Sequence, residues 1–146
     1  MSQTAKILDL NVIKAKQEQE DAGEWFTYEE GGRFLVAFIG RDDFSRKLNR
    51  LEEMVRLQRP DLKKKDARQN YIKKLPPEIA EENGYRAMYG TLVLAWEDVG
   101  APPIEFTEEN FVAVFRQVRG LGNAILEFSG ERENYRKEQI EQNAGN

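Results

Sequence analysis

The 146-residue chain contains no cysteine and no histidine. These absences exclude disulfide bonds, thiolate nucleophiles and the usual zinc sites built from cysteine and histidine. They also remove the side chain that most often acts as a general acid or base. Carboxylate catalysis and metal sites made only of oxygen ligands stay open. The two absences therefore favour a protein without catalytic residues, metal or cofactor.

Long apolar runs are also missing, because no run approaches the roughly 20 residues that a transmembrane helix needs. The N-terminus, MSQTAKILDLNVIKAKQ, lacks the long apolar stretch and small-residue cleavage site of a signal peptide. We therefore expect no membrane contact and a cytoplasmic location. The formal net charge of −4 gives no overall case for binding nucleic acid.

The chain length fits one domain. We divide the chain into a flexible N-terminal arm, residues 1–23, a single helical domain with a β-hairpin, residues 24–136, and a polar C-terminal tail, residues 137–146. An arm of this kind is expected to be mobile unless a partner orders it. Its apolar residues could form one short docking element: Ile7, Leu8, Leu10, Val12 and Ile13.

Residues 24–40 predict a β-hairpin, because two β-prone runs flank Gly31-Gly32. If these glycines form a two-residue turn, Phe26 faces Ala37 and shares one face of the ribbon with Leu35. Both faces are then largely apolar, and a lone hairpin cannot bury both in water. One face or the free strand edge is thus available to a partner, unless both faces pack inside the monomer. The candidate partner-binding residues are Trp25, Phe26, Tyr28, Leu35 and Phe38.

Helical signals fill most of the remaining chain. Apolar residues spaced at four, three and four positions predict a helix that begins at Phe44 and ends before Pro60. Pro76-Pro77 begins a second helix, and its apolar part, AMYGTLVLAW at residues 87–96, is expected to be the central helix of the core. A last helix is expected after Gly120 and Gly122. The predicted fold is mainly α: a bundle of about four helices with an N-terminal β-hairpin.

The segment RPDLKKKDARQNYIKK, residues 59–74, holds seven bases and two acids. One interpretation is a patch that binds phosphates. The other is a solvated, mobile connection between helices. The second is favoured because Tyr71 is the single aromatic residue of the segment and the segment has no glycine, so we expect no specific binding of nucleic acid.

Residues 92–111, LVLAWEDVGAPPIEFTEENF, have the features of a structural joint between two helices. Gly100 can end one helix, and Thr107 can cap the next. Phe106 before the cap and Phe111 at the fourth helical position form the pattern of a hydrophobic staple. Trp96 is expected to anchor this joint. The acids of the segment could instead serve as catalytic or metal carboxylates, but no recognisable ligand loop supports that alternative.

The order of these elements resembles that of the tail assembly chaperones of long-tailed, siphophage-type bacteriophages. The resemblance covers roughly residues 24–136. Its most telling part is LAW, residues 94–96, followed by PIEFTEENF, residues 103–111. No single motif is diagnostic, and the joint departs from the expected pattern because Val99-Gly100-Ala101-Pro102 is less polar than the turn we would expect.

The resemblance implies a non-catalytic protein that binds the tape measure protein in the host cytoplasm, while tail tube protein subunits polymerise around that client. It also implies absence from the finished virion. Self-association is a separate expectation, which depends on the apolar surface of the hairpin. A second interpretation is a structural head-tail connector or minor tail protein that stays in the particle. A third, a small nucleic-acid-binding protein, depends only on residues 59–74.

Overall fold

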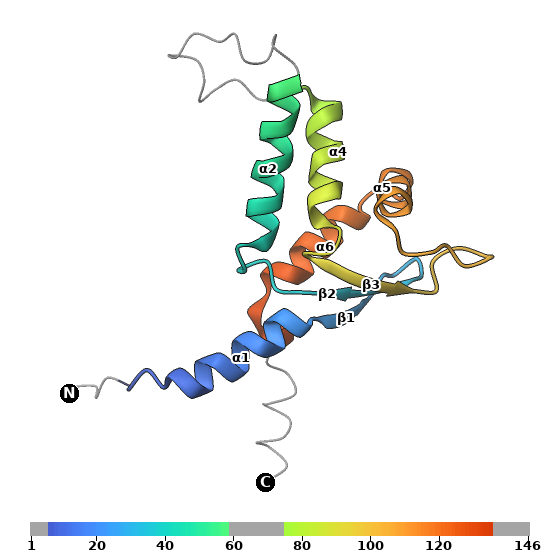
Figure 1. Cartoon of the computed structure of the whole chain (residues 1–146). Coiled ribbons are helices and arrows are strands. Elements are labelled where there is room, and N and C mark those ends of the chain that lie inside the picture. The colour runs from blue at the N-terminus through green and yellow to red at the C-terminus, as the bar shows by residue number, and fades with distance from the viewer. Residues whose placement is uncertain (1–5, 59–74, 136–146) are drawn as a thin grey trace.

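The computed structural model describes residues 6–58 and 75–135. Figure 1 shows a small sheet with one pair of helices rising from it, two helices packed behind it, and an N-terminal helix that projects to one side. Two predicted features, the basic connection at 59–74 and the polar tail at 137–146, lie outside the described residues.

The sheet has three antiparallel strands in the order β1-β2-β3. The strands are β1 at Glu24–Thr27, β2 at Arg33–Val36 and β3 at Val93–Glu97. The predicted hairpin therefore exists, but it is part of a larger sheet whose third strand comes from the middle of the chain.

The predicted two-residue turn of the hairpin is wrong. Phe26 lies opposite Phe34, and Trp25 lies opposite Leu35. The strands are joined by a five-residue loop that begins at Tyr28, whose backbone N–H donates to the carbonyl of Gly32 over 3.0 Å. Both loop glycines have positive φ, which glycine adopts at little cost. The longer loop changes the pairing, so Phe26 shares a face with Phe34 and not with Leu35.

The predicted central helix at residues 87–96 is also wrong from Tyr89 onward. Helix α4, Pro77–Met88, ends as Tyr89 takes an extended conformation, and Gly90 then adopts a φ of 77°. The backbone N–H of Gly90 donates to the carbonyl of Val93 over 2.9 Å, which reverses the chain into β3. A short apolar run can be a strand or a helix by its pattern alone. Here the edge of β2 supplies hydrogen-bond partners that favour the strand.

Part of the predicted flexible arm is helical. Helix α1 covers Leu10–Ala22, and the Asp9 carboxylate caps it by accepting hydrogen bonds from two backbone N–H groups. Its C-terminal end contacts the domain, because Glu20 is buried and its carbonyl accepts from the backbone N–H of Phe38 over 3.0 Å. The Glu20 carboxylate also lies 3.4 Å from the Arg132 guanidinium.

Helix α2, Asp43–Gln58, runs beside α4 (Figure 1). Its extent confirms the helix predicted from Phe44 to before Pro60. Lys47 ties this pair to the rest of the domain, since its Nζ donates to the carbonyl of Tyr89 over 2.7 Å and lies 3.2 Å from the Glu108 carboxylate. No residue of α2 is fully buried, so this helix lies at the periphery of the core.

The core lies between the sheet, the end of α4 and two later helices. Helix α5 is Glu108–Gln117, helix α6 is Leu121–Gly130, and the short 3-10 helix η1 is Arg132–Tyr135. Gly120, with a φ of 86°, forms the break that the sequence predicts before α6. The main cluster of buried side chains comes from β2, the end of α4, the turn before β3, β3 itself, α5 and α6: Phe34, Val36, Met88, Leu92, Val93, Phe111, Phe115, Leu121 and Ile125.

The fold is thus mainly α with a small β component, as predicted at that level. The four-helix bundle with an N-terminal hairpin is not what the structure shows. The described ranges contain five α-helices and a three-stranded antiparallel sheet. The sheet organises the helices, because α5 and α6 pack on one of its faces while α2 and α4 extend away from it (Figure 1).

Candidate partner-binding surface

Trp96, on β3, lies at the centre of the predicted joint. Its ring centroid is 5.1 Å from that of Phe106 and 6.0 Å from that of Phe111. Its Nε1–H donates to the backbone carbonyl of Ile104 over 2.9 Å, which holds the loop after β3 against the strand. The joint therefore connects a strand to α5, and not two helices as predicted, but the anchoring contacts of Trp96 are present.

Thr107 caps α5 as the sequence predicts. Its side-chain oxygen accepts a hydrogen bond from the backbone N–H of Asn110 over 3.1 Å. Phe106 and Phe111 form the predicted staple, with ring centroids 6.1 Å apart and nearly perpendicular planes. Phe111 is fully buried and also stacks on Phe115 at 4.0 Å. We use "the joint" below for Trp96, Phe106, Thr107 and Phe111.

The turn that follows β3, between Trp96 and Phe106, has an unusual backbone. Asp98 has a φ of 58°, a left-handed conformation that residues other than glycine seldom adopt. Gly100 also has a positive φ, and a Cβ at this position would lie 2.6 Å from the side chain of Ile104. The turn is therefore tight enough to require glycine there, and the helix-ending role predicted for Gly100 is replaced by a role in this turn.

The structure separates the five predicted partner-binding residues. Phe26 and Tyr28 pack against the core, with the Phe26 ring 5.0 Å from that of Phe128. Phe38 follows β2 and is buried between Tyr135 and the Arg132 guanidinium. Trp25 and Leu35 lie opposite each other on the other face of the sheet. The five residues therefore do not form one surface, and binding by any of them stays a prediction.

Two faces of the sheet can be defined from these pairings. The inner face carries Phe26, Phe34 and Trp96, which lie opposite one another across the three strands. The outer face carries the alternate positions of each strand: Trp25, Thr27, Arg33, Leu35, Ala95 and Glu97. Trp25 is the most exposed aromatic residue among the described large hydrophobics, with 37% of its surface accessible.

Two charged side chains, Arg33 and Glu97, lie beside Trp25 on the outer face. The Arg33 guanidinium lies over the Trp25 ring at 4.7 Å from its centroid and pairs with the Glu97 carboxylate at 2.5 Å. Arg33 thus fixes the orientation of the indole while leaving much of it accessible. An apolar ring held beside paired charges is a common composition of protein contact surfaces, where aromatic residues and arginine are enriched.

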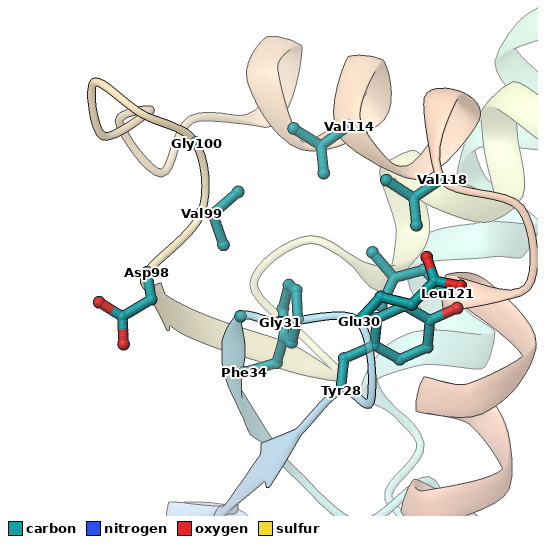
Figure 2. Close-up of a pocket in the computed structure, with 11 residues that line it drawn as sticks. Tyr28, Glu30, Gly31, Phe34, Asp98, Val99, Gly100, Val114, Val118 and Leu121 are labelled. Atoms are coloured by element: carbon teal, nitrogen blue, oxygen red, sulfur yellow. The ribbon is translucent and has the colours of Figure 1, made fainter.

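A pocket of about 250 Å³ opens at the other end of the sheet, where the β1–β2 loop meets the turn after β3 and the end of α5 (Figure 2). Phe34, Val99, Val114 and Val118 supply an apolar lining, and Figure 2 shows them directed toward the same space. The three valines are only partly buried, so solvent reaches the pocket. Val114 and Val118 are four positions apart, a spacing that places both on one face of a helix, whereas no local pattern indicates that Val99 joins them.

Acidic residues of the β1–β2 loop lie at one side of this pocket. Glu30 is exposed on its rim, and Glu29 precedes it in the same loop. Tyr28 also lines the pocket, and its hydroxyl donates to the carbonyl of Arg119 over 3.3 Å. Desolvation raises the pKa of the Tyr28 phenol, and the carboxylates of Glu30 and Glu29 raise it further. Glu29 and Glu30 therefore place acidic side chains on the side of the rim that the β1–β2 loop forms.

Two other kinds of site are absent from residues 6–58 and 75–135. No cluster of three or more acidic side chains there has an arrangement that could hold a metal ion. No helix there is both long enough and apolar enough to span a bilayer.

The described residues form a mainly α fold with a small three-stranded sheet, and the aromatic joint lies where the chain passes from β3 to α5. The family model described as "YdaY prophage protein" matches residues 41–146, so the chain belongs to this family of phage-derived proteins. The match contains the joint and excludes the hairpin with Trp25 and Leu35. The chain matches no curated protein and no solved structure.

Proposed function

We propose that the chain is a non-catalytic tail assembly chaperone, which binds the tape measure protein in the host cytoplasm while tail tube subunits assemble around that client. Membership of a prophage protein family supports a role in the life of a phage. The order of the predicted elements resembles that of tail assembly chaperones, and this resemblance supports the more specific role of a chaperone. The prediction of a chaperone over a structural connector or minor tail protein depends on the surface that the client would contact.

The observation that carries the proposal is the outer face of the sheet. Trp25 is 37% exposed and lies on β1, which is an edge strand of the described sheet. Leu35 and Ala95 extend the same face across the other two strands, and both are partly exposed. A row of apolar side chains beside a free edge is suited to covering an apolar stripe of another protein.

A long client that is soluble only when covered needs many weak, reversible contacts along its length. An outer face with one aromatic anchor and an ion pair at its border gives such a contact. Arg33 and Glu97 can remain hydrated at the rim while Trp25 loses water, because they are half-exposed at 41% and 50% of their side-chain surfaces. Binding of this kind requires no chemical reaction at the surface.

Co-expression with the tape measure protein encoded beside the chain's gene tests the proposal. The wild-type chain should increase the soluble fraction of the tape measure protein and co-purify with it. Trp25→Lys should abolish both effects without changing the fold, since the side chain is on the surface. Met54→Lys is the matched control, because Met54 is 49% exposed on α2, outside the sheet.

Equal loss of binding in both variants would show that the outer face is not the specific contact. No co-purification with the wild-type chain would overturn the chaperone proposal. Mass spectrometry of mature particles distinguishes the two candidate functions. A chaperone should be missing from the particles, whereas a connector or minor tail protein should be retained.

A further inference from the structure

The beginning of the described chain carries an apolar segment with almost no burial. Ile7 is 92% exposed, Leu8 is 69% exposed and Leu10 is 71% exposed. Val12, one turn into α1, is 45% exposed. Four large aliphatic side chains within six residues are rarely left in water without a function, because covering them is favourable. We use "the arm segment" for residues 6–13.

The pocket between the β1–β2 loop and α5 can receive such side chains. Its apolar lining is accessible, and no described residue of its own chain fills it. Its volume of about 250 Å³ has room for aliphatic side chains. It is smaller than the roughly 300–1,000 Å³ of sites that enclose drug-sized ligands. Insertion of one or two side chains from a protein segment therefore fits the pocket better than a cofactor does.

The charges of these two surfaces are complementary. Lys6, Lys14 and Lys16 flank the apolar part of the arm segment, with Asp9 as the single acid between residues 6 and 16. The pocket rim carries Glu30 and the neighbouring Glu29, and Asp98 contributes to the adjoining turn. Figure 2 shows the Asp98 carboxylate directed away from the pocket, so Glu30 is the acid best placed to face a lysine.

The arm segment cannot fill the pocket of its own chain in this fold. Helix α1 and β1 follow each other, so the arm segment begins at one end of the molecule and the β1–β2 loop turns at the other (Figure 1). Helix α1 alone has 13 residues, which separates its two ends by about 20 Å. Folding back would require α1 to unwind, with loss of its Asp9 cap.

We propose that the arm segment of one copy of this chain inserts into the pocket between the β1–β2 loop and α5 of a second copy. The two surfaces lie on different parts of the molecule, so the contact is heterologous and a pair of copies keeps one free arm and one free pocket. Copies can then add head to tail into a ring or an open chain. This inference concerns contacts between copies and stands independently of the proposed client.

Engineered disulfides test the contact directly, because the natural chain has no cysteine to compete. Leu8→Cys in one tagged copy and Glu30→Cys in an untagged copy should form a mixed disulfide on mild oxidation. Both positions are exposed, so the changes should not affect folding. The matched control pairs Leu8→Cys with Leu57→Cys, since Leu57 is 57% exposed on α2. Equal yields from the two pairs would overturn the proposal.

Sedimentation velocity of surface variants gives a second test. Wild-type chains should associate as concentration rises, and Leu8→Glu or Glu30→Lys alone should each weaken association by about tenfold or more. A mixture of the two variants should recover 1:1 dimers, because the intact arm of one fits the intact pocket of the other. Wild-type chains that stay monomeric, or a mixture that recovers no dimer, would contradict head-to-tail insertion.

Discussion

Trp25 and Trp96 are the two tryptophans of the chain, and they lie on opposite faces of the same sheet. Trp96 faces inward, contacts two phenylalanine rings and donates a hydrogen bond to Ile104. Trp25 faces outward and is 37% exposed, with the Arg33 guanidinium over its ring. The same side chain thus stabilises the fold in one position and is available to a partner in the other.

This difference separates two kinds of apolar residue in the chain. Those of the joint have partners within the domain, whereas those of the outer face and the arm segment are covered only in part. The family match begins at residue 41, so it contains the joint and the β3 part of the outer face but leaves out Trp25, Leu35 and the arm segment. We infer that the joint belongs to the shared fold of the family, and that contacts through the outer face involve a segment outside the matched region.

The largest effect is expected from Phe111→Ala. Phe111 is fully buried and contacts Phe115, Trp96 and Phe106. Removal of a buried ring costs about 3–5 kcal/mol, from lost transfer energy and the cavity that remains. Because small domains have a total stability of about 5–15 kcal/mol, much of the chain should unfold at moderate temperature. Chemical denaturation followed by circular dichroism measures this loss, and a change below about 1 kcal/mol would refute the central place of Phe111 in the core.

Trp96→Ala should be next. Trp96 is half-buried, so its removal should cost about 3 kcal/mol, near the lower end of the range for large aromatic side chains. The hydrogen bond to Ile104 is lost as well, which should loosen the loop before α5. The same denaturation experiment checks the stability, and Trp96→Phe is the control that keeps an aromatic ring. If Trp96→Ala keeps wild-type stability but fails to bind the client, then the joint itself is a contact surface.

Thr107→Ala should have a smaller effect. The variant loses the hydrogen bond from the Asn110 N–H to the cap, worth about 1 kcal/mol. Client binding should be unchanged because the cap lies away from the outer face. Thermal unfolding gives the stability, and Thr107→Ser provides the control because serine can also cap a helix. A loss as large as that of Trp96→Ala would mean that the cap supports more than α5.

Trp25→Ala should have the smallest effect on the free energy of unfolding, about 0.5–1 kcal/mol, since the side chain lies on the outer face and is 37% exposed. Its effect on association with the tape measure protein should nevertheless be the largest of the four variants. Pull-down with the purified chain, alongside thermal unfolding, distinguishes the two effects. Destabilisation comparable to that of Phe111→Ala would place Trp25 in the core and remove the contrast between the two tryptophans.

The sequence allows the joint to be predicted well, because capping and stapling depend on residues within one turn of each other. Thr107, Phe106 and Phe111 are separated by at most five positions, so their contacts follow from helix geometry. The same locality explains why the starts of α2, α4 and α5 match their predicted positions.

The remaining features depend on contacts between distant residues. Residues 93–97 form a strand because the edge of β2, some sixty positions earlier, is there to pair with them. Their apolar pattern alone is compatible with a helix. The hairpin pairing depends on loop length, which two adjacent glycines do not determine. The pocket joins Glu30, Val99 and Val118 from three separate elements, so no local pattern indicates it.

Single-tryptophan fluorescence tests the contrast between the two faces most directly. Trp25→Phe leaves only Trp96 as a reporter, and Trp96→Phe leaves only Trp25. Each variant is titrated with a tape measure segment that lacks tryptophan, and quenching by acrylamide is measured. We predict that binding shifts the emission of Trp25 to shorter wavelength and protects it from the quencher, while Trp96 is unchanged. Protection of Trp96 with no change at Trp25 would contradict the account.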